Sequence, residues 1–339
     1  MIALNRFIPD KAYINPKALD YDKGIAIKNT LESLGVPIIL SRSVKIDEET
    51  VQKKYIQSKK TIYVTLNNQK KLQPCRPSAD YMFHLSSSCP AHCEYCYLQT
   101  TQGEKPFLKL FVNLEDIFNV IDNYIQLKPS DYTYFEAGSL TDPIALEHLS
   151  DNLKDGIEYF GKSNQGRLRV VSKYDYVDGF LDIQHHNHTK FRFSMNAQYV
   201  IDTFEHHTSN FEERILAASK IADAGYPIGF IIAPIMVFDG WKEGYDHLFK
   251  ELSLKLKDYK KEITFELIQH RYTQTAKELI LERFPKTSLD MDEATRQLKW
   301  GPYGKFKYVY LKEVSSDMKA FMIDSINKYF NNAVIEYFT

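Results

Sequence analysis

The sequence predicts an α/β fold: a partial (β/α)6, TIM-like barrel with a small N-terminal α/β subdomain and a C-terminal β-hairpin and helix extension. Helix and strand patterns alternate through the middle of the 339 residues, as in repeated βαβ units around a parallel sheet. Most polar residues of interest follow predicted strands, where βα loops build the sites of such barrels. With 44% hydrophobic residues and 43 basic against 44 acidic side chains, the chain supplies its own core and disorder is excluded.

The N-terminal subdomain is expected over residues 1–78 and the barrel with its extension over residues 79–339. The subdomain elements are a helix near 25–34 and strands at 38–40 and 61–66. Six barrel strands are expected at Tyr81–Leu85, Tyr132–Ala137, Leu168–Ser172, Phe191–Met195, Ile228–Ala233 and Ile263–Ile268. The helices between them are expected at Leu114–Ile125, Ile144–Tyr159, Phe211–Ala224 and Gly244–Leu256, with a shorter one near Val177.

The pattern changes after Gln269, where helix-like segments lead into an aromatic and basic hairpin at about 296–312. Gly301, Pro302 and Gly304 lie among aromatic residues, which is typical of a hairpin turn. A last helix is expected near 315–330.

The N-terminus has no long apolar core or cleavage site of a signal peptide. The longest apolar stretch, residues 226–238, contains two prolines and is shorter than the ~20 residues that a membrane helix needs. We therefore expect a cytoplasmic protein without a membrane partner.

Two segments carry basic residues and no acid, although the whole chain is nearly neutral. Residues 53–76 contain seven Lys or Arg side chains, and residues 296–312 contain five. They predict either solvated lysine-rich surfaces or a polyanion-binding face divided between two parts of the chain.

Three of the four cysteines lie within eight residues, as Cys89, Cys93 and Cys96 in a Cys-x3-Cys-x2-Cys run. Four cysteines are too few for a disulfide scaffold of this length. Thiolates this close can converge on one metal centre, and three of them would leave one iron of a four-iron cluster open to a small molecule. The alternatives are a zinc site completed by His92, which lacks the paired Cys-x2-Cys units of structural zinc modules, and buried cysteines without a ligand.

The spacing resembles the signature of the radical S-adenosylmethionine superfamily, and the wider string CPAHCEYCYLQTT resembles the spore photoproduct lyase family. Further similar strings occur in order along nearly the whole chain: FVNLEDIF, KFRFSMN, TFELIQHR, LDMDE, KWGPYGKFKYVY and the terminal EYFT. The resemblance implies a 4Fe-4S cluster on the three cysteines, with S-adenosylmethionine chelated to the fourth iron. It implies reversal of the spore photoproduct thymine dimer by a 5′-deoxyadenosyl radical, with a one-electron reductant such as flavodoxin or ferredoxin.

Five residues are expected in the cofactor-binding group on this resemblance: Ser139, Thr141, Lys173, Ser194 and Asn196. Thr141 stands where a serine is expected, which keeps the hydroxyl.

Ser139 also marks the main departure from the family, because it matches the place of the usual hydrogen-donor cysteine. A serine O–H bond is too strong to give its hydrogen readily to an allyl radical. Cys75 is the remaining thiol, and we expect it to be the surrogate donor; its alternative role is that of a small buried hydrophobic side chain. Tyr95 and Tyr97 match tyrosines that return a hydrogen atom to deoxyadenosine.

UV-damaged double-stranded DNA is the implied partner. The two basic segments would neutralise phosphates, and the hairpin would wedge beside the extruded dimer. The expected contacts are Arg271, Tyr303, Lys305 and Lys307. Pro302 stands where the family has an arginine, and an ion pair is the structural alternative for Arg271.

Two other functions remain open at the level of sequence. One is a diverged radical S-adenosylmethionine enzyme that acts on another substrate, suggested by Ser139 and Pro302. The other is a non-catalytic iron-sulfur protein that binds nucleic acid.

Overall fold

The structure is a computed structural model that describes residues 6–128, 130–301 and 306–339. The chain forms two compact units. Unit one contains Met1–Pro90 and Gln102–Phe191, and unit two contains Ala91–Thr101 and Arg192–Thr339. This division differs from a boundary at residue 78, and independent folding of residues 1–78 stays a prediction.

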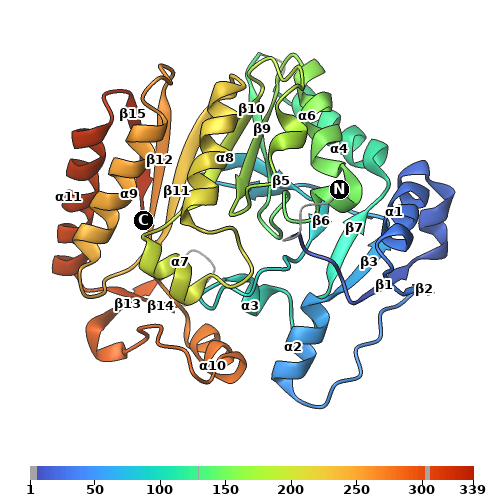
Figure 1. The fold of residues 1–339 in the computed structure, drawn as a ribbon, viewed down its shortest axis with the longest axis horizontal. Helices are drawn as coiled ribbons and strands as arrows, with labels where there is room; N and C mark the ends of the chain where they lie inside the picture. The colour runs from blue at the N-terminus through green and yellow to red at the C-terminus, as the bar shows by residue number, and fades with distance from the viewer. Residues whose placement is uncertain (1–5, 129, 302–305) are drawn as a thin grey trace. The chain divides into compact units, whose positions relative to one another are not determined.

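Unit one begins with a five-stranded sheet covered by helices. The strand order is β2-β1-β3-β7-β6, with β1 parallel to β2 and β3, and β3 parallel to β7. Its elements are β1 (Lys11–Ile14), η1 (Pro16–Asp20), α1 (Asp22–Ser33), β2 (Ile38–Leu40), α2 (Val51–Lys59), β3 (Thr61–Thr65), β6 (Ser86–Ser87) and β7 (Leu108–Phe111). Ile27 and Leu31 of α1 pack with Ile14, Ile62 and Val64 of the strands, which buries one face of this sheet (Figure 1).

The second group of strands in unit one runs in the order β9-β8-β5-β4, with β5, β8 and β9 parallel and β4 antiparallel. These elements are β4 (Gln73–Cys75), β5 (Ala79–Phe83), α4 (Leu114–Gln126), β8 (Thr133–Ala137), α5 (Glu147–Ser150), α6 (Asn152–Lys162), β9 (Gly166–Ser172) and η2 (Asp178–Phe180). The first three predicted barrel strands are therefore confirmed, with bounds moved by one or two residues. Strand β10 (Thr189–Met195) carries the chain from unit one into unit two.

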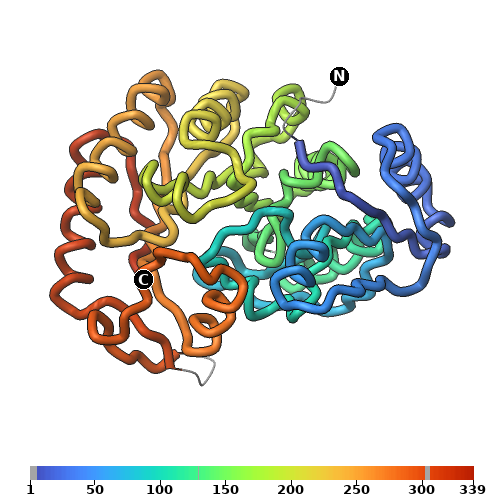
Figure 2. Tube along the Cα trace, turned by 60° about the horizontal axis from the view of Figure 1, so that its bottom comes forward, coloured from blue at the N-terminus to red at the C-terminus, as the bar shows by residue number. Residues whose placement is uncertain are grey.

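Unit two continues the same pattern, with strand order β15-β12-β11-β10 and parallel pairing of β11, β12 and β15. Its other elements are α3 (Leu98–Thr101), α7 (Gln198–Phe204), α8 (Phe211–Asp223), β11 (Ile228–Ile235), α9 (Trp241–Lys255), β12 (Ile263–Gln269), α10 (Gln274–Arg283), η3 (Glu293–Thr295), β13 (Arg296–Trp300), β14 (Phe306–Tyr310), α11 (Lys312–Tyr329) and β15 (Ala333–Phe338). The C-terminal helix α11, red in Figures 1 and 2, runs beside α9. Parallel strands with intervening helices confirm the predicted α/β, barrel-like class.

Two predicted elements are wrong in detail, and one strand was not predicted. The single helix expected at 144–159 is two helices, α5 and α6, because Asp151 between them adopts the left-handed conformation at φ 53°. The helix expected near Val177 is only the single turn η2. The strand that was not predicted is β15, which pairs parallel with β12.

The hairpin at 296–312 is confirmed. β13 and β14 pair antiparallel, from Arg296 opposite Tyr310 to Trp300 opposite Phe306. In the described ranges, no helix combines the length and the apolar character needed to cross a bilayer.

His84, which follows β5, makes the stability of unit one sensitive to acid. Burial lowers the pKa of His84 to about 4, from 6.5 in an unfolded chain. The unfolded chain therefore binds a proton first as the pH falls, so the stability present above pH 6.5 is lost towards pH 4.

We expect the free energy of unfolding to fall by about 3 kcal/mol on acidification, and His84→Gln should remove this pH dependence. Urea unfolding at pH 7 and pH 4.5 measures this. His186→Gln, at an exposed position, is the control, and an equal pH effect in both variants would contradict the prediction.

Candidate functional site

The cysteine motif forms a turn that leads into α3. The backbone N–H of Cys96 donates to the carbonyl of Cys93 at 3.2 Å, and the Gln99 side chain donates to the same carbonyl at 3.1 Å. Cys93 is buried. The turn therefore holds two of the three predicted cluster ligands close together in unit two.

Cys89 belongs to unit one and follows a residue in an unusual backbone conformation. Ser88 has φ 65°, and it is held there by its N–H bond to Leu140 O at 2.8 Å and its hydroxyl bond to Pro106 O at 2.7 Å. Such a conformation persists only when the surroundings fix it. The carbonyl of Cys89 accepts a hydrogen bond from the ammonium of Lys59 at 2.6 Å. The position of Cys89 is therefore fixed by contacts from three segments of unit one.

Within unit two, the connection after α7 pairs with the cysteine loop. The N–H of His92 donates to His206 O at 2.9 Å, and the N–H of Glu94 donates to Phe204 O at 3.0 Å. The Glu94 carboxylate also lies 2.8 Å from His206 Nε2. The ring of His92, the alternative zinc ligand, makes an edge contact with the ring of His207 at 4.9 Å. This pairing braces the loop that contains two of the cysteines.

In the portion of the chain with described coordinates, no group of three or more His, Cys, Asp or Glu side chains is arranged to hold a metal ion. The fit to a cluster therefore rests on the donor set. Three soft thiols in one short loop suit iron-sulfur chemistry better than a hard cation.

The two predicted relay tyrosines have different surroundings. Tyr95 donates its hydroxyl hydrogen bond to Glu205, which also pairs with Arg214 at 2.6 Å. Burial of the hydroxyl and the adjacent Glu205 charge raise the pKa of Tyr95 well above its usual value. Tyr97, by contrast, has a side chain that is 59% exposed. Glu205 and Arg214 were missed by the sequence analysis, because no motif marks a buried ion pair.

In unit one, the cofactor candidates Thr141 and Lys173 are joined by a buried carboxylate. Thr141 donates its hydroxyl to Ser88 O at 2.6 Å, beside Cys89. Asp142 accepts from the Lys173 backbone N–H and from the Ser172 hydroxyl, both at 2.7 Å. Burial raises the pKa of Asp142 to about 6, although these hydrogen bonds oppose the shift. Asp142, which the sequence analysis did not single out, therefore fixes the loop that presents Lys173.

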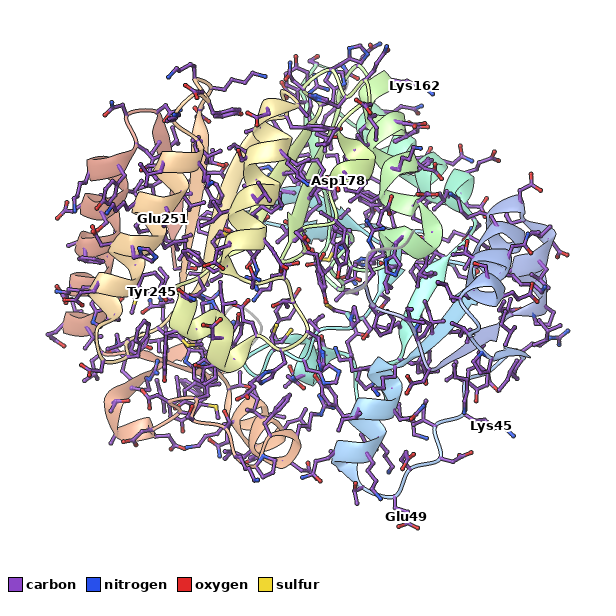
Figure 3. All side chains as sticks on the ribbon, viewed as in Figure 1. Lys45, Glu49, Lys162, Asp178, Tyr245 and Glu251 are labelled. Carbon is purple, nitrogen blue, oxygen red and sulfur yellow. The ribbon has the colours of Figure 1, made fainter. Side chains whose placement is uncertain are left out.

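In unit two, Ser194 and Asn196 lie at the end of β10 and are both buried. The Asn196 amide donates to Pro234 O at 2.8 Å, and its oxygen accepts from the Tyr245 hydroxyl at 2.7 Å and from Ala197 N–H at 3.0 Å. Tyr245 reaches this place from α9 and is labelled in Figure 3. These contacts fix the Asn196 side chain and brace the end of β10.

Cys75 and Ser139 lie together in unit one. Cys75, at the end of β4, has its sulfur 3.4 Å from Ser139 Oγ and 3.5 Å from Glu136 Oε1. Ser139 donates to the same Glu136 oxygen at 2.6 Å. The second Glu136 oxygen accepts from Ser78. The structure thus places Cys75, the remaining thiol, beside Ser139, and both side chains contact Glu136, which the sequence did not single out.

The predicted DNA contacts are partly described. Arg271 and Lys307 lie close enough that the Arg271 charge adds to burial in lowering the pKa of Lys307. The exposed rings of Trp300, at the end of β13, and Phe306, at the start of β14, pack edge to face with their centres 4.8 Å apart. Tyr303 and Lys305, with Pro302, lie outside the described residues.

Two basic side chains of the acid-free segments are not available to phosphates, which corrects the expectation for those segments. Lys59 is buried beside Cys89. Arg296 is also buried, pairs with Asp290 at 3.1 Å and stacks on the Tyr310 ring at 3.6 Å. Five basic side chains of the first segment are exposed: Lys53, Lys60, Lys70, Lys71 and Arg76.

Comparison with known proteins covers the whole chain. The family described as spore photoproduct lyase matches residues 7–339. The spore photoproduct lyase of Bacillus subtilis (strain 168) is 43% identical over 340 residues, with 99% of each chain covered. That of Clostridium acetobutylicum is 42% identical over 324 residues, covering 95% of this chain and 96% of the relative.

Solved structures of similar proteins give the same result. A spore photoproduct lyase double mutant with bound AdoMet and dinucleoside spore photoproduct superimposes with a TM-score of 0.94 at 42% identity, covering 98% of this chain and 99% of that chain. A spore photoproduct lyase complexed with dinucleoside spore photoproduct has a TM-score of 0.93 at 41% identity, with the same coverage. The similarity therefore extends over nearly the whole chain and includes parts of both units.

Proposed function

Because the chain belongs to the spore photoproduct lyase family, we propose that it is a DNA repair enzyme that reverses the spore photoproduct, 5-thyminyl-5,6-dihydrothymine, to two thymines. The observation that carries the proposal is the match over 98% of the chain to structures that hold AdoMet and the dinucleoside lesion. The fold, the cysteine turn and the placement of Cys75 agree with it.

Cys89, Cys93 and Cys96 are proposed to hold a 4Fe-4S cluster, leaving one iron open for S-adenosylmethionine. When bound, the cluster would pass an electron from a flavodoxin- or ferredoxin-like reductant to S-adenosylmethionine, which would split the sulfonium and generate a 5′-deoxyadenosyl radical. The protein's part is to fix the thiols. The Ser88 conformation holds Cys89, and the turn before α3 holds the other two.

Lys173 is proposed to bind the methionine or ribose end of the cofactor, with its loop fixed by Asp142. Ser139, Thr141, Ser194 and Asn196 complete the proposed cofactor-binding group.

Lys173→Ala should weaken S-adenosylmethionine binding by about 10- to 100-fold, because a charged hydrogen bond contributes about 1.5–3 kcal/mol. Anaerobic calorimetric titration of the cluster-loaded protein measures the dissociation constant. Lys162→Ala, at the exposed position labelled in Figure 3, is the control. An unchanged dissociation constant in Lys173→Ala would remove Lys173 from the cofactor-binding group.

Cys75 is proposed to donate the hydrogen atom that completes repair. The 5′-deoxyadenosyl radical would take the hydrogen atom from C6 of the dimer and become 5′-deoxyadenosine. Scission of the methylene bridge would then leave an allyl radical on one thymine. The S–H bond of Cys75 then breaks, a C–H bond forms on the thymine methyl carbon, and a thiyl radical remains on Cys75. Glu136 and Ser139, at 3.5 and 3.4 Å, fix the thiol.

Tyr97, with its exposed side chain, is proposed to pass a hydrogen atom in the return relay, while Tyr95 is held by Glu205.

DNA is proposed to bind through the exposed basic side chains and the aromatic hairpin. Arg271 and Lys307 form one positive group, to which Lys305 adds its charge, and Trp300, Phe306 and Tyr303 supply rings for a wedge. Proteins that act on a base inside a duplex take that base out of the stack, and the inserted rings would occupy the space beside it.

Anaerobic incubation of the reduced protein with S-adenosylmethionine tests the proposal against its alternatives. Release of 5′-deoxyadenosine and methionine is expected, and its absence would leave an iron-sulfur protein without this activity. Release without repair of the dimer would indicate an enzyme for another substrate.

A further inference from the structure

Lys59 is a buried lysine next to a proposed cluster ligand. It is the last residue of α2 and is 4% exposed. Its ammonium donates to the carbonyl oxygen of Cys89 at 2.6 Å and lies 5.5 Å from the centre of the Tyr55 ring. The next residue, Lys60, is exposed and lies 3.5 Å from Asp10. Two adjacent lysines therefore have opposite surroundings.

Lys59 places a positive charge in the interior beside Cys89. Lysine is almost never fully buried, because an ammonium loses its hydration in a protein interior. The Cys89 carbonyl and the Tyr55 ring both present negative charge density to it. A cluster with three thiolate ligands is anionic, and each reduction adds another negative charge. A cation in this place therefore suits a cluster site and favours the reduced state over the oxidised one.

We propose that Lys59 is a positioning residue that fixes Cys89 and raises the reduction potential of the 4Fe-4S cluster. This inference rests on the proposed function, because it requires the cluster on Cys89, Cys93 and Cys96. The electron comes from the external reductant and resides on the cluster. Its contribution is a fixed positive charge in a region of low dielectric constant, where charge interactions are stronger than in water.

The test is a redox titration of the cluster-loaded protein, followed by electron paramagnetic resonance in the absence of substrate. Lys59→Gln keeps a hydrogen-bond donor and removes the charge. It should lower the equilibrium constant for reduction about tenfold, which is about 59 mV for a one-electron couple. Lys59→Arg keeps the charge and should retain the wild-type potential. Lys60→Gln removes a neighbouring exposed charge and should also leave the potential unchanged, since solvent screens it.

A wild-type potential in iron-replete Lys59→Gln would overturn the inference. A folded Lys59→Gln protein without iron would also overturn it, because Lys59 would then serve assembly of the cluster. If Lys59→Gln does not fold, Lys59→Arg decides: an unchanged potential supports the role of charge, and a lowered one contradicts it. These outcomes are separate from the proposed function, which fails only if the wild-type protein does not release 5′-deoxyadenosine or repair the dimer.

Discussion

Cys75→Ala will abolish the formation of clean thymine product while leaving the release of 5′-deoxyadenosine intact. The substitution removes the thiol that lies 3.4 Å from Ser139, and the remaining hydroxyl does not give up its hydrogen readily. We expect the yield of thymine to fall about 100-fold, equivalent to about 2.7 kcal/mol, with unquenched or adduct products in its place. Product analysis by liquid chromatography and mass spectrometry on the dinucleoside lesion measures both quantities.

Moving the thiol across the same contact provides the matched control. The double variant Cys75→Ser with Ser139→Cys exchanges the two side chains and should restore most of the clean repair. Ser139→Ala, with Cys75 intact, should still give clean thymine rather than adducts, although loss of a cofactor contact should lower the rate. Full repair by Cys75→Ala would eliminate Cys75 as the donor.

Cys96→Ala will remove both repair and the release of 5′-deoxyadenosine. Cys96 closes the turn on Cys93, and its loss leaves two thiols, too few to hold the cluster and keep one iron open. We expect 5′-deoxyadenosine formation to fall by more than about 10³-fold, or about 4 kcal/mol. Iron content and the visible absorption of the anaerobic protein give an independent measure.

Cys75→Ala is the control for this result, because it also removes one cysteine but should keep its iron. Equal loss of iron in both variants would indicate a general effect of removing thiols. Wild-type iron content and activity in Cys96→Ala would refute the proposed ligand set.

The barrel strands were predictable because each is a short apolar run bounded by turn residues. β11 and β12 bury nearly every residue of their central segments, as a parallel sheet covered by helices requires. The helix at 144–159 was mispredicted because the apolar period of the sequence continues across Asp151. The left-handed backbone of Asp151 nevertheless ends one helix and begins the next. β15 was missed because its residues are only half-buried and alternate weakly.

The candidate metal site could be proposed from the sequence because its residues are close together in the chain. Cys89, Cys93 and Cys96 lie in one short run, so their spacing alone indicated a metal centre. Glu136, Asp142 and Glu205 could not be found in this way, because they contact Cys75, Lys173 and Tyr95, which are distant in sequence. Arg214 is an ordinary helical arginine until the fold buries it against Glu205.

Lys59 shows the limit of reasoning from charge patterns. In the sequence it is one of seven basic residues in an acid-free segment, which indicated a surface for phosphates. The structure divides that segment by burial, with Lys60 exposed and Lys59 directed to the Cys89 carbonyl. The direction of a side chain depends on its position along the helix, so adjacent lysines point in different directions and only one of them faces the interior.

The most direct test of the repair function is the conversion of synthetic dinucleoside spore photoproduct by the reduced, cluster-loaded protein with S-adenosylmethionine under anaerobic conditions. The account predicts two thymidine units for each lesion consumed, with Cys75 required for clean product. An intact lesion together with steady release of 5′-deoxyadenosine would contradict it.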